Sequence, residues 1–388
     1  MIGPFGLRPK GTMSVRALPL ARALVARGHV VRMILPPWDY PHDAGCRTQD
    51  EGVEIENMAL PAAVPGLFHL NTTQRLVKCA LDFQPDVIHC FKPKAYAGLA
   101  AWWLWQLKRL GHVKARVIID TDDWEGAGGW NDLKQYSWAQ KKMFAWQEQW
   151  GLTHNDAVTV ASRALQSIVW SLGVKPERMA YVPNGIVHPA FRSQNPEDKI
   201  LAPGFCILLY TRFFEFKTGR IIEVLRRVVE QEPSAKLVVV GRGFFGEEEQ
   251  LLKQAAAIGL RDSIEYAGWV DAAALPDYFV QANVAIYPFD DTLINRTKCS
   301  VKLIDLLSAG VPVVADAVGQ NAEYIRHNET GVLVPSGNVA AMVQAILDLG
   351  RDGARADRLG RAAAQDMIER FSWERLALDV EHLYGVTR

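Results

Sequence analysis

The chain has few cysteines and no excess of charge of either sign. Its five cysteines are scattered over 388 residues and form neither a CxxC pair nor a metal-ligand spacing. This pattern fits a reducing compartment and excludes a disulfide framework or a structural zinc site. Lys plus Arg and Asp plus Glu each number 43, so the formal net charge is zero and we expect no nucleic-acid partner.

Long hydrophobic runs and low-complexity tracts are also lacking. No apolar run reaches the roughly 18 residues of a membrane span, and no charged N-terminal segment precedes an apolar one. We therefore expect a cytoplasmic protein. Short β-branched runs instead alternate with helical stretches, which is typical of an α/β fold with parallel sheets.

The alternation falls into two series, and 388 residues are too many for one ordinary core, so we expect two domains. The first series of predicted strands is 30–35, 53–58, 86–91, 116–120, 156–161 and 179–182. The second is 205–211, 236–240, 263–267, 283–287 and 311–315. Between them, residues 186–203 contain three prolines and no periodic pattern, which indicates a linker.

A ligand-binding corner is predicted at residues 295–323. Ser300 can cap a helix that carries Asp305 on the side of the preceding loop, Gly310 ends that helix, and 311–314 form a buried strand. A helix N-terminus at the carboxyl edge of a parallel sheet suits a diphosphate. The alternative is a structural element with nothing bound.

Two cations in the second half support the diphosphate interpretation. Arg212 ends a predicted strand, and Lys217 precedes the next helix, so the pair can neutralise a diphosphate. Alone, such a pair is typical of a solvated loop. Gly241 and Gly268 also follow strands of this series, and the combination favours a binding site.

The N-terminus carries a glycine-rich loop with Gly3, Gly6 and Gly11, ahead of a helix that is predicted from Ser14. Glycines let a backbone approach a ligand closely, although this is no GxGxxG motif. Only two residues precede Gly3, so most of the expected strand is missing and we expect the start to lie several residues upstream.

Eight of the twelve tryptophans lie between residues 102 and 150, interleaved with lysine and arginine. Trp138, Met143, Trp146 and Trp150 approximate one helical face, which predicts helix packing. The alternative is an aromatic and basic surface that contacts an anionic membrane or a lipid-linked acceptor.

Seven motifs in chain order resemble the retaining GT-B glycosyltransferases of the group 1 type (glycosyltransferase family 4-like), which use nucleotide sugars. They are the glycine loop with RGHxV at 27–31, PDVIH at 85–89, VPNG at 182–185, the Arg212 and Lys217 pair, the GxV at Gly268, the segment 305–314 and FSW at 371–373. The resemblance covers nearly the whole chain. It implies two Rossmann-like domains that face a central cleft: an acceptor domain at 1–185, the linker 186–203 and a donor domain at 204–370, with a last helix at 371–388 crossing back.

The resemblance also implies roles for single residues. Arg212 and Lys217 would hold the diphosphate and stabilise its charge as it leaves, and Asp305 would bind the ribose. The implied donor-binding residues are Gly11, Thr12, Arg212, Lys217, Gly241, Gly268, Val270, Thr297, Cys299, Ser300, Val301 and Asp305. Thr297 stands where the family has the first glutamate of its E-x7-E motif, which puts sugar recognition or activity in question.

A second departure is the cluster Asp120, Asp122 and Asp123, where the family often has a histidine. Clustered carboxylates can bind magnesium, but they are also common as loop caps and solvated turns, and we expect no metal. We assign Asp122 a catalytic role as a carboxylate near the anomeric centre, together with Arg212 and Lys217.

Acceptor contacts are assigned to His89, Lys92 and Asp123, with packing as the alternative for His89. The expected function is a metal-independent, hexosyltransferase-like enzyme of polysaccharide or glycolipid biosynthesis. It would transfer a sugar from a nucleotide diphosphate sugar to a glycan, lipid-linked or small-molecule acceptor, at the inner face of the membrane if it binds one. The alternatives are a nucleotide-sugar epimerase of the same fold and a degenerate nucleotide-binding scaffold.

Overall fold

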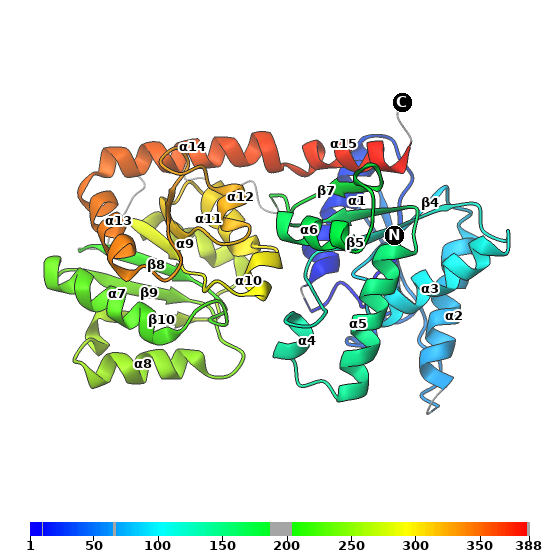
Figure 1. Cartoon of the computed structure of the whole chain (residues 1–388), viewed down its shortest axis with the longest axis horizontal. Helices are drawn as coiled ribbons and strands as arrows, with labels where there is room; N and C mark the ends of the chain where they lie inside the picture. Colours follow the sequence, from blue (N-terminus) through cyan, green and yellow to red (C-terminus); the bar gives the residue numbers. More distant parts are fainter. Residues whose placement is uncertain (10, 65–66, 187–203, 386–388) are drawn as a thin grey trace. The chain divides into compact units, whose positions relative to one another are not determined.

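Runs of buried β-branched residues form the strands, and the computed structural model of the chain divides them between two units (Figure 1). Unit 1 comprises Met1–Gly185, Thr297–Cys299 and Ser372–Arg388, and unit 2 comprises Ile186–Arg296 and Ser300–Phe371. The structure describes residues 1–9, 11–64, 67–186 and 204–385. The predicted linker, apart from Ile186, lies outside the described residues.

The strands of unit 1 form two ladders that meet at Ile2. One ladder is parallel and has the order β4-β5-β6-β7, and the other has the order β1-β3-β2. Single bridges join Ile2 to Ile34 on one side and to Cys90 on the other, so Ile2 stands where the expected first strand would be. The strands are β1 (Arg32–Leu35), β2 (Arg47–Asp50), β3 (Val53–Asn57), β4 (Val87–Phe91), β5 (Arg116–Thr121), β6 (Ala157–Val160) and β7 (Met179–Tyr181).

The helices of unit 1 include one from the end of the chain. They are a π-helical turn (Met13–Ala17) that continues into α1 (Leu18–Ala26), then α2 (Leu67–Asp82), α3 (Ala95–Arg109), α4 (Trp130–Leu133), α5 (Trp138–Thr153), α6 (Arg163–Ser171) and α15 (Trp373–Tyr384). Helix α15 packs on α1, and its Trp373, Leu376 and Val380 share a buried cluster with Leu20 and Leu24. The last helix therefore belongs to the core of unit 1.

Unit 2 has one six-stranded parallel sheet in the order β10-β9-β8-β11-β12-β13. Counted along the chain, this is the order 3-2-1-4-5-6 of the doubly wound dinucleotide-binding fold. The strands are β8 (Cys206–Tyr210), β9 (Lys236–Val240), β10 (Ile264–Gly268), β11 (Val284–Tyr287), β12 (Val313–Asp316) and β13 (Val332–Val334).

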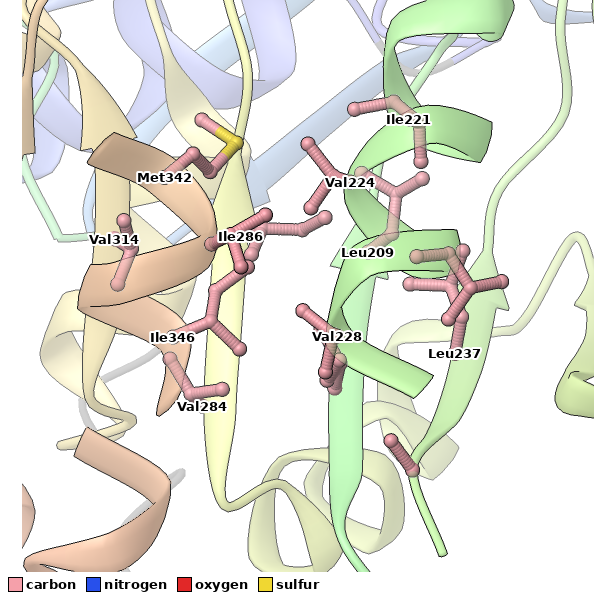
Figure 2. Packing of buried hydrophobic residues seen from close by; sticks show 14 of the residues in the cluster. Leu209, Ile221, Val224, Val228, Leu237, Val284, Ile286, Val314, Met342 and Ile346 are labelled. Atoms are coloured by element: carbon pink, nitrogen blue, oxygen red, sulfur yellow. The ribbon is translucent and has the colours of Figure 1, made fainter. Parts of the chain in front are cut away.

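Helices cover both faces of this sheet. Figure 2 shows one face, where Ile221, Val224 and Val228 of α7 and Met342 and Ile346 of α13 pack over the strands. A second buried cluster, with residues of α9, α11 and α14, covers the other face. The helices are α7 (Thr218–Gln231), α8 (Glu247–Ala257), α9 (Leu275–Gln281), α10 (Leu293–Thr297), α11 (Val301–Ser308), α12 (Asn321–Tyr324), α13 (Val339–Arg351) and α14 (Gly353–Phe371).

The packing prediction for α5 is wrong for three of its four residues, whereas Trp150 is half-buried and its ring stacks on His154. Trp138, Met143 and Trp146 are 75%, 41% and 46% exposed. The buried side of α5 carries Gln147 and Glu148 instead. Periodicity correctly grouped the aromatic residues on one face of the helix, but that face is exposed. The face toward the core carries polar side chains that form hydrogen bonds.

The proposed side-chain cap of α11 is also wrong. Ser300 occupies the N-cap position, but its hydroxyl makes no capping hydrogen bond. Its backbone N–H donates to Gln320 Oε1 at 2.9 Å. The start of α11 is therefore fixed by the loop that follows β12 rather than by Ser300 itself.

Candidate active site

The strand order of unit 2 reverses between β8 and β11, and ligands of doubly wound sheets bind outside the carboxyl ends of the strands at such a point. The loops that follow these two strands are joined by hydrogen bonds. Asp290 N–H and Asn295 Nδ2 both donate to Glu215 O, at 2.8 and 2.7 Å, and Lys217 N–H donates to Asp290 Oδ2 at 3.0 Å. The loop that carries Arg212 and Lys217 is thus tied to the loop after β11.

A buried ion pair extends this tie to β12. Arg220 Nη1 lies 2.8 Å from Asp316 Oδ2, and Arg220 Nη2 lies 3.3 Å from Asp290 Oδ1. Phe289 N–H also donates to Asp316 Oδ2, at 2.7 Å. Burial raises the pKa of Asp316, and the Arg220 charge opposes that rise. Sequence reasoning missed these residues, although an acid at the end of a buried strand was a signal for them.

Glycines bring three loops of unit 2 close together. Gly241 has φ +129, and a Cβ there would lie 1.9 Å from Thr211 O, so only glycine fits. Its N–H donates to Gly268 O at 2.7 Å. The exposed Arg212 side chain stands beside this corner, with its guanidinium 5.8 Å from the centre of the Phe244 ring. The predicted residues Arg212, Gly241 and Gly268 therefore share one edge of the sheet.

Charged groups also converge on Tyr210 at the end of β8. The Lys302 ammonium lies 3.4 Å from the centre of the Tyr210 ring. Burial raises the pKa of Tyr210, the Asp305 charge raises it further, and the Arg212 charge lowers it. Asp305, only 5% exposed, thus acts on the same group as Arg212. Lys302 was not predicted, because a lysine on a helix is common on solvated faces.

The predicted donor-binding residues divide between the units. Unit 2 holds Arg212, Lys217, Gly241, Gly268, Val270, Ser300, Val301 and Asp305, and unit 1 holds Gly11, Thr12, Thr297 and Cys299.

In unit 1, Thr12 and Lys92, which were predicted for different roles, both contact Asp122. Thr12 Oγ1 donates to Asp122 Oδ2 at 2.6 Å. Lys92 Nζ lies 3.3 Å from Asp122 Oδ1, 3.0 Å from Asp123 Oδ2 and 3.4 Å from Glu125 Oε1. Lys92 has the left-handed φ of +56°, which is strained for a lysine. One half-buried ammonium therefore contacts three carboxylates after β5.

The pKa values of the two neighbouring aspartates are shifted in opposite directions. Burial acts to raise the pKa of Asp122, but Lys92 and the Thr12 hydrogen bond outweigh it, and the net pKa is lowered. Burial raises the pKa of Asp123 to about 6, and the Asp122 charge adds to the rise while Lys92 opposes it. At neutral pH Asp122 is an anion that can stabilise positive charge.

Asp120 has a different environment from its two neighbours. Arg16 binds it with two hydrogen bonds, from Nε at 2.8 Å and from Nη2 at 2.5 Å, and Thr159 Oγ1 donates at 2.6 Å. Asp120 is fully buried, and these three hydrogen bonds satisfy its carboxylate within unit 1. Within the described residues, no group of three His, Cys, Asp or Glu side chains is arranged to hold a metal ion.

His89 is part of the packing of unit 1. It is 1% exposed, with Nδ1 2.8 Å from the Tyr384 hydroxyl and Nε2 3.1 Å from Thr159 Oγ1. Burial holds its pKa well below the ordinary value, so the ring is neutral. Both nitrogens are occupied, and we assign His89 to the core rather than to an acceptor contact.

Two family models match most of the chain. The model described as "Glycosyl transferase 4-like domain" matches residues 11–185, and the model described as "Glycosyl transferases group 1" matches residues 210–352. Among the described residues, no helix is both long and apolar enough to cross a membrane.

Curated relatives share about a quarter of their residues with the chain. A phosphatidyl-myo-inositol mannosyltransferase of Mycobacterium leprae is 26% identical over 99% of this chain and 95% of its own length. A GDP-mannose-dependent alpha-(1-6)-phosphatidylinositol monomannoside mannosyltransferase of Mycobacterium tuberculosis is 26% identical over 57% of this chain and 60% of its own length.

Solved structures show the same fold. The sucrose-phosphate synthase of Thermosynechococcus elongatus is similar with a TM-score of 0.72 and 23% identity, over 97% of this chain and 93% of the other. Anabaena HepE, solved in complex with UDP and glucose, is similar with a TM-score of 0.71 and 15% identity, over 100% of this chain and 99% of the other.

Proposed function

The chain belongs to the group 1 glycosyltransferases of the GT-B fold, and we propose that it transfers a sugar from a nucleotide diphosphate sugar with retention of anomeric configuration. The observation that carries this proposal is the position of Arg212 and Lys217 after β8, where the strand order of unit 2 reverses. An anionic leaving group at that place would meet two cations and the backbone around Gly241.

In the proposed reaction, the bond between the anomeric carbon and the diphosphate oxygen breaks, and negative charge builds up on the diphosphate. Arg212 and Lys217 would neutralise that charge, and Asp305 would accept hydrogen bonds from the ribose. These two cations would neutralise the diphosphate as a metal ion does in other transferases, so we expect the reaction to require no metal.

The acceptor oxygen then forms the new bond on the face that the diphosphate leaves, and the acceptor proton passes to the leaving diphosphate. No side chain is then needed as a general base. Asp122, held as an anion by Lys92 and Thr12, would stabilise positive charge on the sugar ring. Asp123 and Lys92 remain candidates for acceptor contacts.

The names of the two mycobacterial relatives support a mannosyl donor and a lipid acceptor. We therefore place a lipid-linked acceptor ahead of a free glycan or a small molecule. The enzyme would act in the cytoplasm, with peripheral contact to an anionic membrane.

Thr297 favours one alternative, a nucleotide-binding scaffold without turnover, because its hydroxyl carries no charge where the family has a glutamate. The test is release of nucleotide from a panel of nucleotide sugars, with and without a lipid extract. We expect nucleotide release that depends on the acceptor. We also expect NMR of the product to show the same anomeric configuration as the donor. Binding without release from any donor would support the scaffold.

A further inference from the structure

We propose that the outer face of α5, formed by Trp138, Lys142, Met143 and Trp146, docks the enzyme on an anionic membrane surface. The inference rests on the proposed function only for the reason why the enzyme would bind a membrane, which is to reach a lipid-linked acceptor. The binding itself requires neither a donor nor catalysis.

The four residues form one stripe because they follow helical spacing. Trp138, Lys142 and Trp146 are four residues apart, and eight residues of α-helix rise about 12 Å. Trp138 is 75% exposed and Trp146 is 46% exposed, whereas tryptophan is usually well buried. Two indole rings and a thioether on one solvated stripe are the apolar component of an interfacial helix.

The opposite side of α5 fixes the helix to unit 1. Gln147 Oε1 accepts from Ala95 N–H at 2.9 Å, and Gln147 Nε2 donates to Ala95 O at 3.0 Å. Glu148 Oε2 accepts from Glu125 N–H at 2.7 Å. These bonds anchor polar side chains inward, so α5 cannot rotate its tryptophans into the core without breaking them.

The N-terminus of α5 is also fixed. Ser137 and Gln140 form a reciprocal capping box, which satisfies backbone donors at the first turn. The first turn, which carries Trp138, is therefore ordered while Trp138 stays in solvent. The exposed tryptophans therefore belong to an ordered helix and not to a frayed helix end.

The charge around the stripe is positive. Lys134 and Lys142 are exposed, and Lys141 is half-buried. Residues 130–153, which span α4 and α5, contain two acids: Glu148 is buried, and Asp132 is exposed. Lys141 Nζ lies 3.8 Å from Asp132 Oδ1, a weak surface contact. Three lysines against one exposed acid suit anionic headgroups.

This combination selects a membrane over a protein partner. Indole rings favour the headgroup boundary, and lysines flank them as they do in interfacial helices. Trp170 provides the contrast: it is 45% exposed, but no Lys or Arg lies within four residues of it along the chain. Exposure of tryptophan alone therefore does not distinguish α5, whereas tryptophan together with lysine does.

The test is flotation of the full chain with phosphatidylglycerol vesicles and, separately, with phosphatidylcholine vesicles at low salt. We expect binding to the anionic vesicles only, weakened by added salt. The double substitution Trp138→Ala/Trp146→Ala and the single substitution Lys142→Glu should each lower the vesicle affinity at least tenfold. The matched controls Trp170→Ala and Lys253→Glu should leave it unchanged.

Equal flotation of the wild type and the α5 variants, or no flotation of the wild type, would overturn the proposal. In parallel, nucleotide release from the donor is measured without vesicles, with a water-soluble acceptor. If the protein fails to float but releases nucleotide normally, the docking proposal is wrong and the proposed function is retained. If the protein floats but releases no nucleotide, the proposed function is wrong and the docking proposal is retained.

Discussion

At the scale of single residues, the chemistry that we propose for unit 1 centres on Asp122. Thr12, Lys92 and the burial of the carboxylate together fix both its position and its charge. We expect Asp122→Asn to lower kcat at least tenfold, because the amide keeps an oxygen for Thr12 but loses the negative charge. The measurement is kcat of a purified variant whose Tm shows that it is folded.

The control for that variant is Asp132→Asn, which changes an exposed carboxylate of the same unit. Its kcat should equal that of the wild type. Unchanged kinetics in a folded Asp122→Asn protein would remove the catalytic role of this residue.

Asp123 makes stability depend on pH. Burial raises its pKa from 3.8 to about 6, so the folded state holds this proton more tightly than the unfolded state. Its contribution to stability therefore falls as the pH rises from about 4 to about 6. A shift of about two pKa units corresponds to on the order of 3 kcal/mol.

We therefore expect Asp123→Asn to gain stability relative to the wild type as the pH rises from 4 to 7. Urea unfolding of both proteins across this range measures the gain as a difference in the free energy of unfolding. A difference that is independent of pH would contradict the raised pKa.

At the scale of elements, the loops after β8, β9 and β10 meet at Gly241. Gly241→Ala should lower the free energy of unfolding by about 3 kcal/mol or more, because the new methyl group meets the Thr211 carbonyl and the positive φ is strained. Gly246→Ala is the matched control, since its φ is also positive but nothing lies within 4 Å. It should cost only about 1 kcal/mol. Equal losses in denaturant unfolding would show that the close contact is unimportant.

Strands were predictable because buried β-branched runs identify them without any tertiary information. Every strand of the two predicted series is confirmed, whereas the polar edge strand β2 and the short β13 were missed. Residues 47–50 carry only polar side chains, so no hydrophobic run marked them. Their pairing with β3 depends on the turn at 51–52 rather than on burial.

Side-chain partners were less predictable than elements. The tie between Lys217 and Asp290 joins residues 73 positions apart, and no local pattern indicates it. Asp122, Asp123 and Lys92 were each predicted as site residues, but their ion pairs join positions about 30 residues apart and no local pattern indicated them. Periodicity marked the tryptophan face of α5, but it could not tell which side of the helix the core would cover.

At the scale of the whole molecule, each unit repeats one topological arrangement. The order of unit 2 reverses between β8 and β11, and that of unit 1 reverses between Ile2 and β4. Three of the predicted residues follow from this rule: Gly11 and Lys92 lie after the strands that flank one reversal, and Arg212 lies after a strand that flanks the other. The two family models match these two units in the same order.

The most direct test of the account is nucleotide binding by the full chain. Thermal unfolding is followed with UDP, GDP, ADP and dTDP, first without metal and then with magnesium, for the wild type, Arg212→Ala and the exposed control Arg351→Ala. We expect one nucleotide to raise the Tm without metal, Arg212→Ala to abolish the shift and Arg351→Ala to keep it. No shift with any nucleotide, or a full shift in Arg212→Ala, would contradict the assignment of the diphosphate site.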